Sequence, residues 1–234
     1  MAPARQQLRG GFSTRCGPEF APAQSPYPGN MRFCIFESQD FAMASIAIVV
    51  GHPEQMTYCE ALAEAYRRGA ESKGHEVRLF KLAEMNFDPI LRGGYRKEQP
   101  LEADLQAAYD ALAASDHWVL IFPLWCGDMP ALFKGFIERI LQPDLVRRQG
   151  TENAMNWHIF EKKSARIIMT MAMPVSVYRF WYGPHALKLL KYNILNFIGV
   201  KPVRETLLGM VADASDEKRN SWLKKAEAMG ERAE

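Results

Sequence analysis

The chain has 234 residues, of which 48% are hydrophobic and 24% are charged, and its formal net charge is +2. These ordinary globular values exclude a wholly disordered chain, a collagen-like fibre and a pure coiled coil, and the near-neutral charge argues against bulk binding of nucleic acid. At about 150 residues per domain, the length predicts one large domain or two small ones.

Residues 1–42 differ in composition from the rest of the chain, with five prolines and four glycines that interrupt any helical or strand period. A disordered tail, or a mis-assigned start with Met31 or Met43 as the true beginning, would explain this composition. A targeting segment is the alternative, because three arginines precede the first acidic residue, Glu19. We therefore expect residues 43–234 to form the folded domain.

From residue 46 onward, patterns typical of strands and helices alternate. The expected strands are Ile46–Val50, Glu76–Leu82, His117–Phe122, Arg166–Met171 and Val203–Leu208. The expected helices are Thr57–Lys73, Glu102–Ser115, Met129–Leu141, His185–Ile198 and Ser215–Met229. Alternation of this kind predicts a doubly wound α/β fold with a parallel sheet, and five units suit the flavodoxin-like strand order 2-1-3-4-5.

Helix ends are marked by familiar residues. Thr57 and Glu60 have the spacing of a capping box, and Ser215 is an expected N-cap. Gly74 and Gly199 stand where helices should end. The four cysteines are Cys16, Cys34, Cys59 and Cys126, without a C-x-x-C pair, so we expect neither a metal site nor a disulfide framework. No apolar run approaches the ~20 residues of a membrane-spanning helix, so no membrane insertion is expected.

The strand order places a ligand site where the loops Gly51–Thr57 and Pro123–Pro130 meet. The first loop leads into a helix N-terminus, which favours an anion, and His52 and Thr57 add donors; alternatively, His52 only caps a turn. The first loop lacks G-x-G-x-x-G, and the chain has no P-loop motif. In the second loop, Trp125 could cover a flat heterocycle or could be a buried structural residue.

A third loop, from Thr170 to His185, carries several aromatic residues. It could form a wall for a planar ligand, an interface, or a hydrophobic plug over the end of the sheet. Cys126 in the second loop could be a nucleophile, but no histidine or acid stands at a spacing that would support this role.

Four segments together resemble the NAD(P)H:quinone oxidoreductase family of flavodoxin-like flavoproteins, which includes modulators of drug activity and ancillary subunits of glutathione-gated potassium efflux systems. They are Gly51-His52-Pro53, Asn86-Phe87-Asp88-Pro89-Ile90, Phe122-Pro123-Leu124-Trp125 and Met129-Pro130-Ala131-Leu132-Phe133-Lys134-Gly135-Phe136. The resemblance runs from about Ser45 to about Met229. It implies a cytoplasmic flavin enzyme, with FAD or FMN as cofactor and NAD(P)H as hydride donor. It also implies a homodimer with the active site at its interface.

The resemblance also implies roles for individual residues. Around the flavin phosphates and ribityl chain it places His52, Thr57 and Tyr58. Along the isoalloxazine ring it places Pro123, Leu124, Trp125, Cys126 and Gly127. At the other polar edge of the ring it places Thr170, Met171, Ala172 and Met173. Tyr178 and His185 correspond to the residues that steady charge on the reduced flavin, and Tyr182 competes with His185 for that role.

These residues imply a ping-pong reaction, in which a nicotinamide and then a quinone use the same place beside the flavin. One alternative is a regulatory, flavin-bearing subunit of a potassium efflux transporter, with that transporter as its partner. Another is a one-electron carrier, which the net charge of +2 disfavours because such carriers tend to be strongly acidic.

Overall fold

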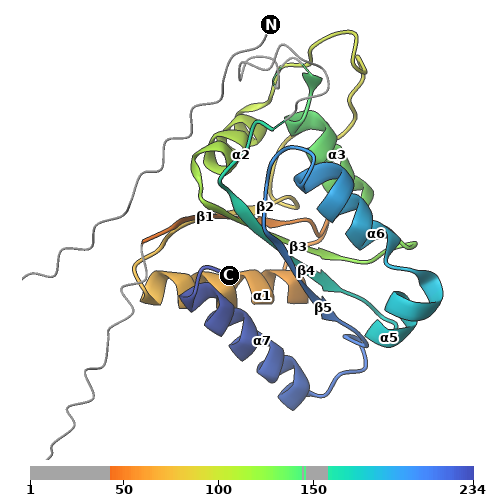
Figure 1. Ribbon diagram of the computed structural model, residues 1–234. Coiled ribbons are helices and arrows are strands. Elements are labelled where there is room, and N and C mark those ends of the chain that lie inside the picture. Colours follow the sequence, from red (N-terminus) through yellow and green to blue (C-terminus); the bar gives the residue numbers. More distant parts are fainter. Residues whose placement is uncertain (1–42, 144, 146–157) are drawn as a thin grey trace, which may run out of the picture. The chain divides into compact units, whose positions relative to one another are not determined.

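The structure is a computed structural model and describes residues 43–143, 145 and 158–234 (Figure 1). Its centre is a five-stranded parallel sheet in the order β2-β1-β3-β4-β5, which confirms the predicted flavodoxin-like topology. The strands are β1 Ser45–Val50, β2 Glu76–Lys81, β3 His117–Pro123, β4 Ser164–Thr170 and β5 Val203–Leu208. The predictions for residues 1–42, whether tail, mis-assigned start or targeting segment, lie outside the described residues.

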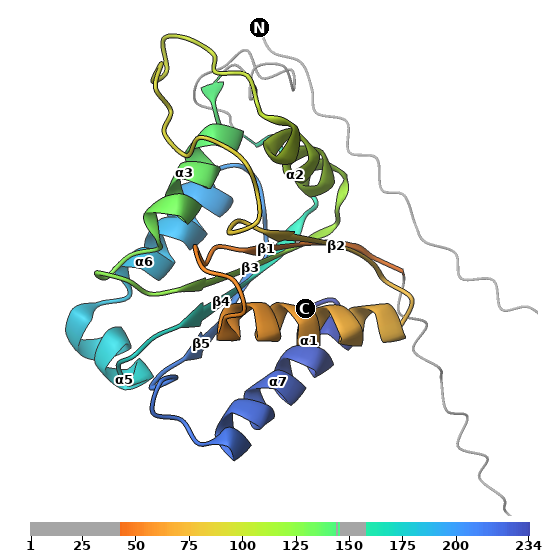
Figure 2. The ribbon, with the colours of Figure 1, turned by 180° about the vertical axis from the view of Figure 1, so that it is seen from behind.

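Helices cover both faces of the sheet. They are α1 Tyr58–Ser72, α2 Ala103–Ala114, α3 Ala131–Ile140, α5 Val175–Val177, α6 His185–Lys188 and α7 Asp216–Glu231, with π-helices η1 Tyr178–Tyr182 and η2 Leu189–Leu195. Helices α1 and α7 lie on one face, and α2, α3 and α6 lie on the other (Figures 1 and 2). This two-sided cover explains why the central strands read as continuous apolar runs.

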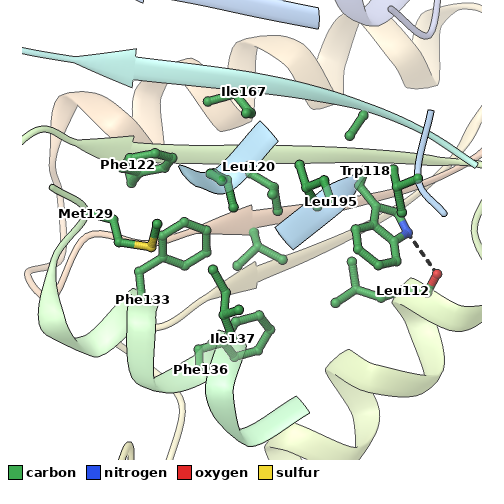
Figure 3. Packing of buried hydrophobic residues seen from close by; sticks show 14 of the residues in the cluster. Leu112, Trp118, Leu120, Phe122, Met129, Phe133, Phe136, Ile137, Ile167 and Leu195 are labelled. Atoms are coloured by element: carbon green, nitrogen blue, oxygen red, sulfur yellow. Dashed lines mark hydrogen bonds between the residues drawn. The ribbon is translucent and has the colours of Figure 1, made fainter. Parts of the chain in front are cut away.

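Each face of the sheet has its own cluster of buried side chains. On the α3 side, Phe122 from β3 packs against Phe133, with ring centroids 5.0 Å apart (Figure 3). There Trp118 donates a hydrogen bond from Nε1 to the Leu112 carbonyl oxygen, at 2.9 Å (Figure 3). The bond satisfies a buried indole N–H and joins β3 to the end of α2.

Helices α1 and α7 pack with their backbones in close contact. A Cβ atom on Gly69 would lie 2.0 Å from the carbonyl oxygen of Glu227, and one on Gly230 would lie 2.0 Å from that of Tyr66. A side chain at either glycine would therefore force the helices apart. The two glycines thus hold α7, which follows the loop after β5, closely against α1.

Two expectations about local structure are wrong. Thr57 occupies the N-cap position of α1, but its side chain makes no cap hydrogen bond, and Glu60 Oε2 instead accepts from the Met56 N–H at 3.1 Å. Residues 175–182, expected as part of a loop, are helical as α5 and η1. Three aromatic residues of η1, Phe180, Trp181 and Tyr182, are exposed and only Tyr178 is buried, so this segment has no apolar stripe that would indicate a helix.

The predicted helix from His185 is present but winds more widely than expected. After the four residues of α6, η2 is a π-helix, and its end is marked by an Asn196 N–H that donates to the Lys191 carbonyl oxygen at 2.9 Å. Leu190 and Leu195, five residues apart, are both buried. The spacing of these two leucines therefore equals that of the i→i+5 hydrogen bonds of a π-helix.

Candidate functional site

Loops from four strands meet at the carboxyl edge of the sheet and enclose a cavity of about 320 Å³, here called the His52 cavity. Its lining residues are His52, Thr57, Tyr58, Cys59, Pro123, Leu124, Trp125, Thr170, Met171, Ala172, Val211 and Ala212. Nine of the twelve residues that the resemblance assigned to a cofactor thus line one cavity. The two loops nominated by the strand order are both part of it.

The loop after β1 turns close to α3. A Cβ atom on Gly51 would lie 2.6 Å from the Phe133 ring, so only glycine lets the chain pass there. Beyond this turn, the Glu54 N–H donates to His52 Nδ1 at 3.0 Å. An acceptor at Nδ1 leaves the ring proton on Nε2 in the neutral form, so His52 keeps a free N–H donor at the cavity.

Thr57 is the polar residue of this cavity that most needs a partner. Its hydroxyl oxygen is buried and has no hydrogen-bond partner among the described residues. It stands at the N-terminus of α1, where the first backbone N–H groups have no acceptor within the helix. A hydroxyl, free amides and the positive end of a helix dipole make this a suitable place for a phosphate.

The side chains of Cys59 and Thr170 meet at the floor of the cavity, with Sγ and Oγ1 3.5 Å apart. Burial raises the pKa of the Cys59 thiol to about 11, so it remains protonated at neutral pH. Cys59 therefore packs as a small neutral side chain. Beside it, the Tyr58 hydroxyl donates to the Arg219 carbonyl oxygen at 2.8 Å and joins α1 to α7.

A two-residue hairpin forms the wall of the cavity after β3. Trp125 and Asp128 exchange backbone hydrogen bonds of 2.8 and 2.9 Å, and Cys126 and Gly127 between them have φ values of 50° and 82°. Two consecutive left-handed residues are typical of a type I′ turn, which favours glycine at the second position. Trp125 is 43% exposed and its ring meets that of His52 edge-on at 5.2 Å, so the structural alternative of a buried tryptophan is wrong.

The far side of the hairpin lines a second cavity of about 370 Å³, here called the His185 cavity. Its lining residues are Gly127, Asp128, His185, Ala186, Lys188, Leu189 and Asn193. The structure thus places Gly127 and His185, which the resemblance assigned to the same site as His52, on the other side of a shared wall.

Tyr178, Cys126 and Met173 line neither cavity. Tyr178 is 2% exposed, and its hydroxyl accepts a hydrogen bond from the Leu187 N–H at 3.2 Å. Burial raises the pKa of this phenol, and the nearby charge of Asp128 adds to the effect, so the hydroxyl keeps its proton. Cys126 is exposed at the tip of the hairpin, and Met173 is half-buried.

Sequence reasoning missed the residues between β5 and α7. Val211 and Ala212 line the His52 cavity, and the Val211 N–H donates to the Met171 carbonyl oxygen at 3.2 Å. The signal was available, because the loop after the strand next to β4 must emerge at the same edge of a parallel sheet.

Within the described part of the chain, no three His, Cys, Asp or Glu side chains gather as metal ligands. No helix in the described ranges combines the length and apolarity needed to span a membrane.

Comparison with known proteins agrees with this architecture. The model of the family described as having a flavodoxin-like fold matches residues 44–231. An uncharacterised NAD(P)H oxidoreductase of Haemophilus influenzae is 25% identical over 184 residues, which cover 76% of this chain and 90% of the relative. An FMN-dependent NADH:quinone oxidoreductase of Macrococcus caseolyticus is 24% identical over 217 residues, covering 80% and 99%.

Among solved structures, the Smu.1420 protein of Streptococcus mutans superposes with a TM-score of 0.65 at 28% identity. The match covers 80% of this chain and 98% of that one. The chain therefore belongs to the flavodoxin-like fold family, where it groups with proteins named as NAD(P)H oxidoreductases.

Proposed function

We propose that the protein is a flavin-dependent NAD(P)H oxidoreductase that reduces quinones or related acceptors by two electrons in a ping-pong reaction. The observation that carries the proposal is the buried, unpartnered hydroxyl of Thr57 at the N-terminus of α1, inside the His52 cavity. A buried hydroxyl without a partner costs free energy, which a phosphate oxygen would recover by accepting a hydrogen bond from it.

The residues of the His52 cavity fit a flavin in two parts. The phosphate end would receive hydrogen bonds from His52 Nε2, the Thr57 hydroxyl and the first amides of α1, with Tyr58 beside them. The ring would lie along Pro123, Leu124 and Trp125, with Trp125 covering apolar area, while residues 170–172 would approach its other polar edge. A bound flavin would supply the redox chemistry of a two-electron transfer from NAD(P)H to the acceptor.

Two residues are proposed as donors to the negative charge that develops at the ring. The Tyr178 hydroxyl accepts from the Leu187 N–H, which leaves its own proton free for donation. His185 lines the neighbouring cavity and would act from there. Donors fixed before the reaction stabilise developing charge without reorganisation, an effect worth a few kcal/mol. Tyr182, which is exposed, is the alternative to His185.

The proposal extends to cofactor, assembly and location. FAD and FMN both carry a phosphate that suits this position, and a relative named as FMN-dependent supports a flavin cofactor. A homodimer would cover the exposed aromatic side chains of Phe180, Trp181 and Tyr182, and we propose a cytoplasmic location, where NAD(P)H is available. The relatives named as oxidoreductases favour an enzyme over the alternative of a regulatory transporter subunit.

The visible spectrum of the purified protein, followed by chromatography of the released cofactor, tests the proposal and distinguishes FAD from FMN. Two variants at helix N-caps make the test specific. Thr57→Val removes a hydroxyl that caps nothing, so flavin affinity should fall about tenfold with little change in the stability of the flavin-free protein. Ser215→Ala is the matched control, because Ser215 accepts a hydrogen bond from the Lys218 N–H at 3.3 Å.

The control should lower stability by about 1 kcal/mol and leave flavin affinity unchanged. A colourless protein that takes up no added flavin would refute the proposal. Equal flavin affinity in the wild type and Thr57→Val would remove its main support.

A further inference from the structure

Three exposed polar side chains, those of His185, Lys188 and Asn193, line the His185 cavity. Among the described residues, Lys188 makes no ion pair, and the side chains of His185 and Asn193 make no hydrogen bond. Lys191, the next lysine along the chain after Lys188, does form an ion pair, with Glu205 at 2.7 Å. Unpaired polar groups that converge in a concave site are typical of a place where a ligand binds.

The unpaired groups are one cation, Lys188, and two side chains, His185 and Asn193, that can donate hydrogen bonds. Lys188 offers an ammonium, Asn193 an amide NH₂ and His185 a ring N–H. Asp128 is the one acidic residue in the lining, and its Oδ1 already accepts a hydrogen bond from the Met129 N–H at 2.7 Å. An excess of donors around an unpaired cation favours an anionic group over a cationic one.

The Trp125–Asp128 hairpin contributes to the lining of both this cavity and the His52 cavity. Trp125 lines the first cavity, whereas Gly127 and Asp128 line the second. The backbone bonds between Trp125 and Asp128 hold the two linings in a fixed relation. One elongated molecule could therefore place different parts of itself on the two sides of the hairpin.

We propose that the His185 cavity recognises an anionic group, a phosphate or a sulfonate, on a substrate whose reacting ring lies at the His52 cavity. The inference rests on the proposed function and adds Lys188 and Asn193 as specificity-determining residues. The anion has two possible sources, which are the 2′-phosphate of NADPH and an acidic substituent on the electron acceptor. In both cases the charge of Lys188 selects the acidic member of a pair of otherwise similar substrates.

Calorimetric titration of the purified protein with NADP⁺ and NAD⁺ tests the first source without any turnover. If the 2′-phosphate binds here, the wild type binds NADP⁺ more tightly, and Lys188→Gln reduces the ratio of the two affinities about tenfold. Asn193→Asp, which adds a negative charge to the same lining, should shift the ratio in the same direction. Lys224→Gln is the matched control, because Lys224 is exposed on α7 across the sheet.

The second source is tested with 1,2-naphthoquinone and its 4-sulfonate as acceptors. If the acceptor supplies the anion, Lys188→Gln raises KM for the sulfonate about tenfold and leaves KM for the neutral quinone unchanged. Two ratios are compared with the wild type: the affinity for NADP⁺ over that for NAD⁺, and KM for the sulfonate over that for the neutral quinone. The proposal is overturned if Lys188→Gln and Asn193→Asp change neither ratio, or if Lys224→Gln changes the ratios equally. Failure of the proposed function would instead appear as no flavin reduction by NADH or NADPH, whatever the titrations show.

Discussion

Gly135 on α3 packs directly against Pro89, since a Cβ atom on Gly135 would lie 2.4 Å from the Pro89 carbonyl oxygen. The two residues belong to two of the four segments that carry the family resemblance, 86–90 and 129–136. The same region is held by Arg139, a fully buried residue whose guanidinium donates to the Glu102 carboxylate at 2.7 Å and to the Pro100 carbonyl oxygen at 2.8 Å. The close approach of Gly135 to Pro89 brings the two segments together in the fold, and Arg139 joins α3 to the chain before α2.

Gly135→Ala should destabilise the protein by about 1–3 kcal/mol, because the added methyl group must push the segment containing Pro89 away from α3. The sign of the change in the free energy of unfolding tests the close contact, because in an open helix interior the same substitution stabilises by up to about 1 kcal/mol. Urea unfolding measures the change, and an unchanged or increased free energy of unfolding would contradict the close contact.

Stability should depend on pH through His117. Burial, together with the charges of Arg166 and Arg204, lowers the pKa of His117 from 6.5 to about 4. The unfolded chain therefore binds a proton at a pH where the folded protein does not, so stability is complete above pH 6.5 and falls as the pH drops towards 4. Between pH 7.5 and 5 this one residue should cost about 2 kcal/mol.

Urea unfolding at several pH values within that range measures the slope, and most carboxylates are still ionised there. His117→Gln should reduce the slope of the free energy of unfolding against pH. The substitution also removes part of the contact between His117 Nδ1 and Ser164 Oγ, which lie 2.7 Å apart. A variant whose slope equals that of the wild type would show that another group titrates.

Tyr178→Phe and His185→Gln should each slow reduction of the bound flavin by about 10- to 100-fold and leave the flavin in place, because they remove donors to developing charge. Stopped-flow absorbance measures the rate after mixing with NADH or NADPH. Tyr182→Phe is the control, since Tyr182 is the alternative that we do not favour. Wild-type rates in the first two variants would rule out both assignments.

The proposed homodimer should depend on η1. Phe180 and Trp181 are 88% and 87% exposed, an unusual position for two adjacent large aromatic side chains. Sedimentation should find twice the chain mass of 26.6 kDa for the wild type and the single chain mass for the double variant Phe180→Ser, Trp181→Ser. Met43→Ser, which also removes an exposed apolar side chain, should stay dimeric. A monomeric wild type would refute the dimer.

A chain that begins at Met43 should fold, bind flavin and turn over like the full chain, because we propose that residues 43–234 form the whole flavin-binding domain. The family match over residues 44–231 supports this boundary. Circular dichroism and flavin content measure the outcome. Loss of flavin on truncation would assign residues 1–42 a role in the site.

The strands could be predicted because short continuous apolar runs such as Ile46–Val50 are typical of buried strands. The five alternating strand–helix units favoured the strand order 2-1-3-4-5. This order placed the loops that contain His52 and Trp125 at the same edge of the sheet. The hairpin could not be foreseen, because its separation of Trp125 from Gly127 depends on two consecutive left-handed residues that the sequence does not require. Helix η1 escaped prediction because three of its four aromatic side chains, those of Phe180, Trp181 and Tyr182, are exposed.

With the proposed flavin phosphate at the start of α1, the unpaired hydroxyl of Thr57 would link the folding of this protein to the supply of its cofactor. The start of α1 forgoes a cap worth about 1 kcal/mol, and a phosphate at that position would replace it. Each tenfold rise of free flavin above its Kd should then add about 1.4 kcal/mol to stability. In a cell short of flavin, a larger fraction of the chains would be unfolded and open to proteases, so the abundance of the enzyme would follow vitamin supply without any dedicated regulator.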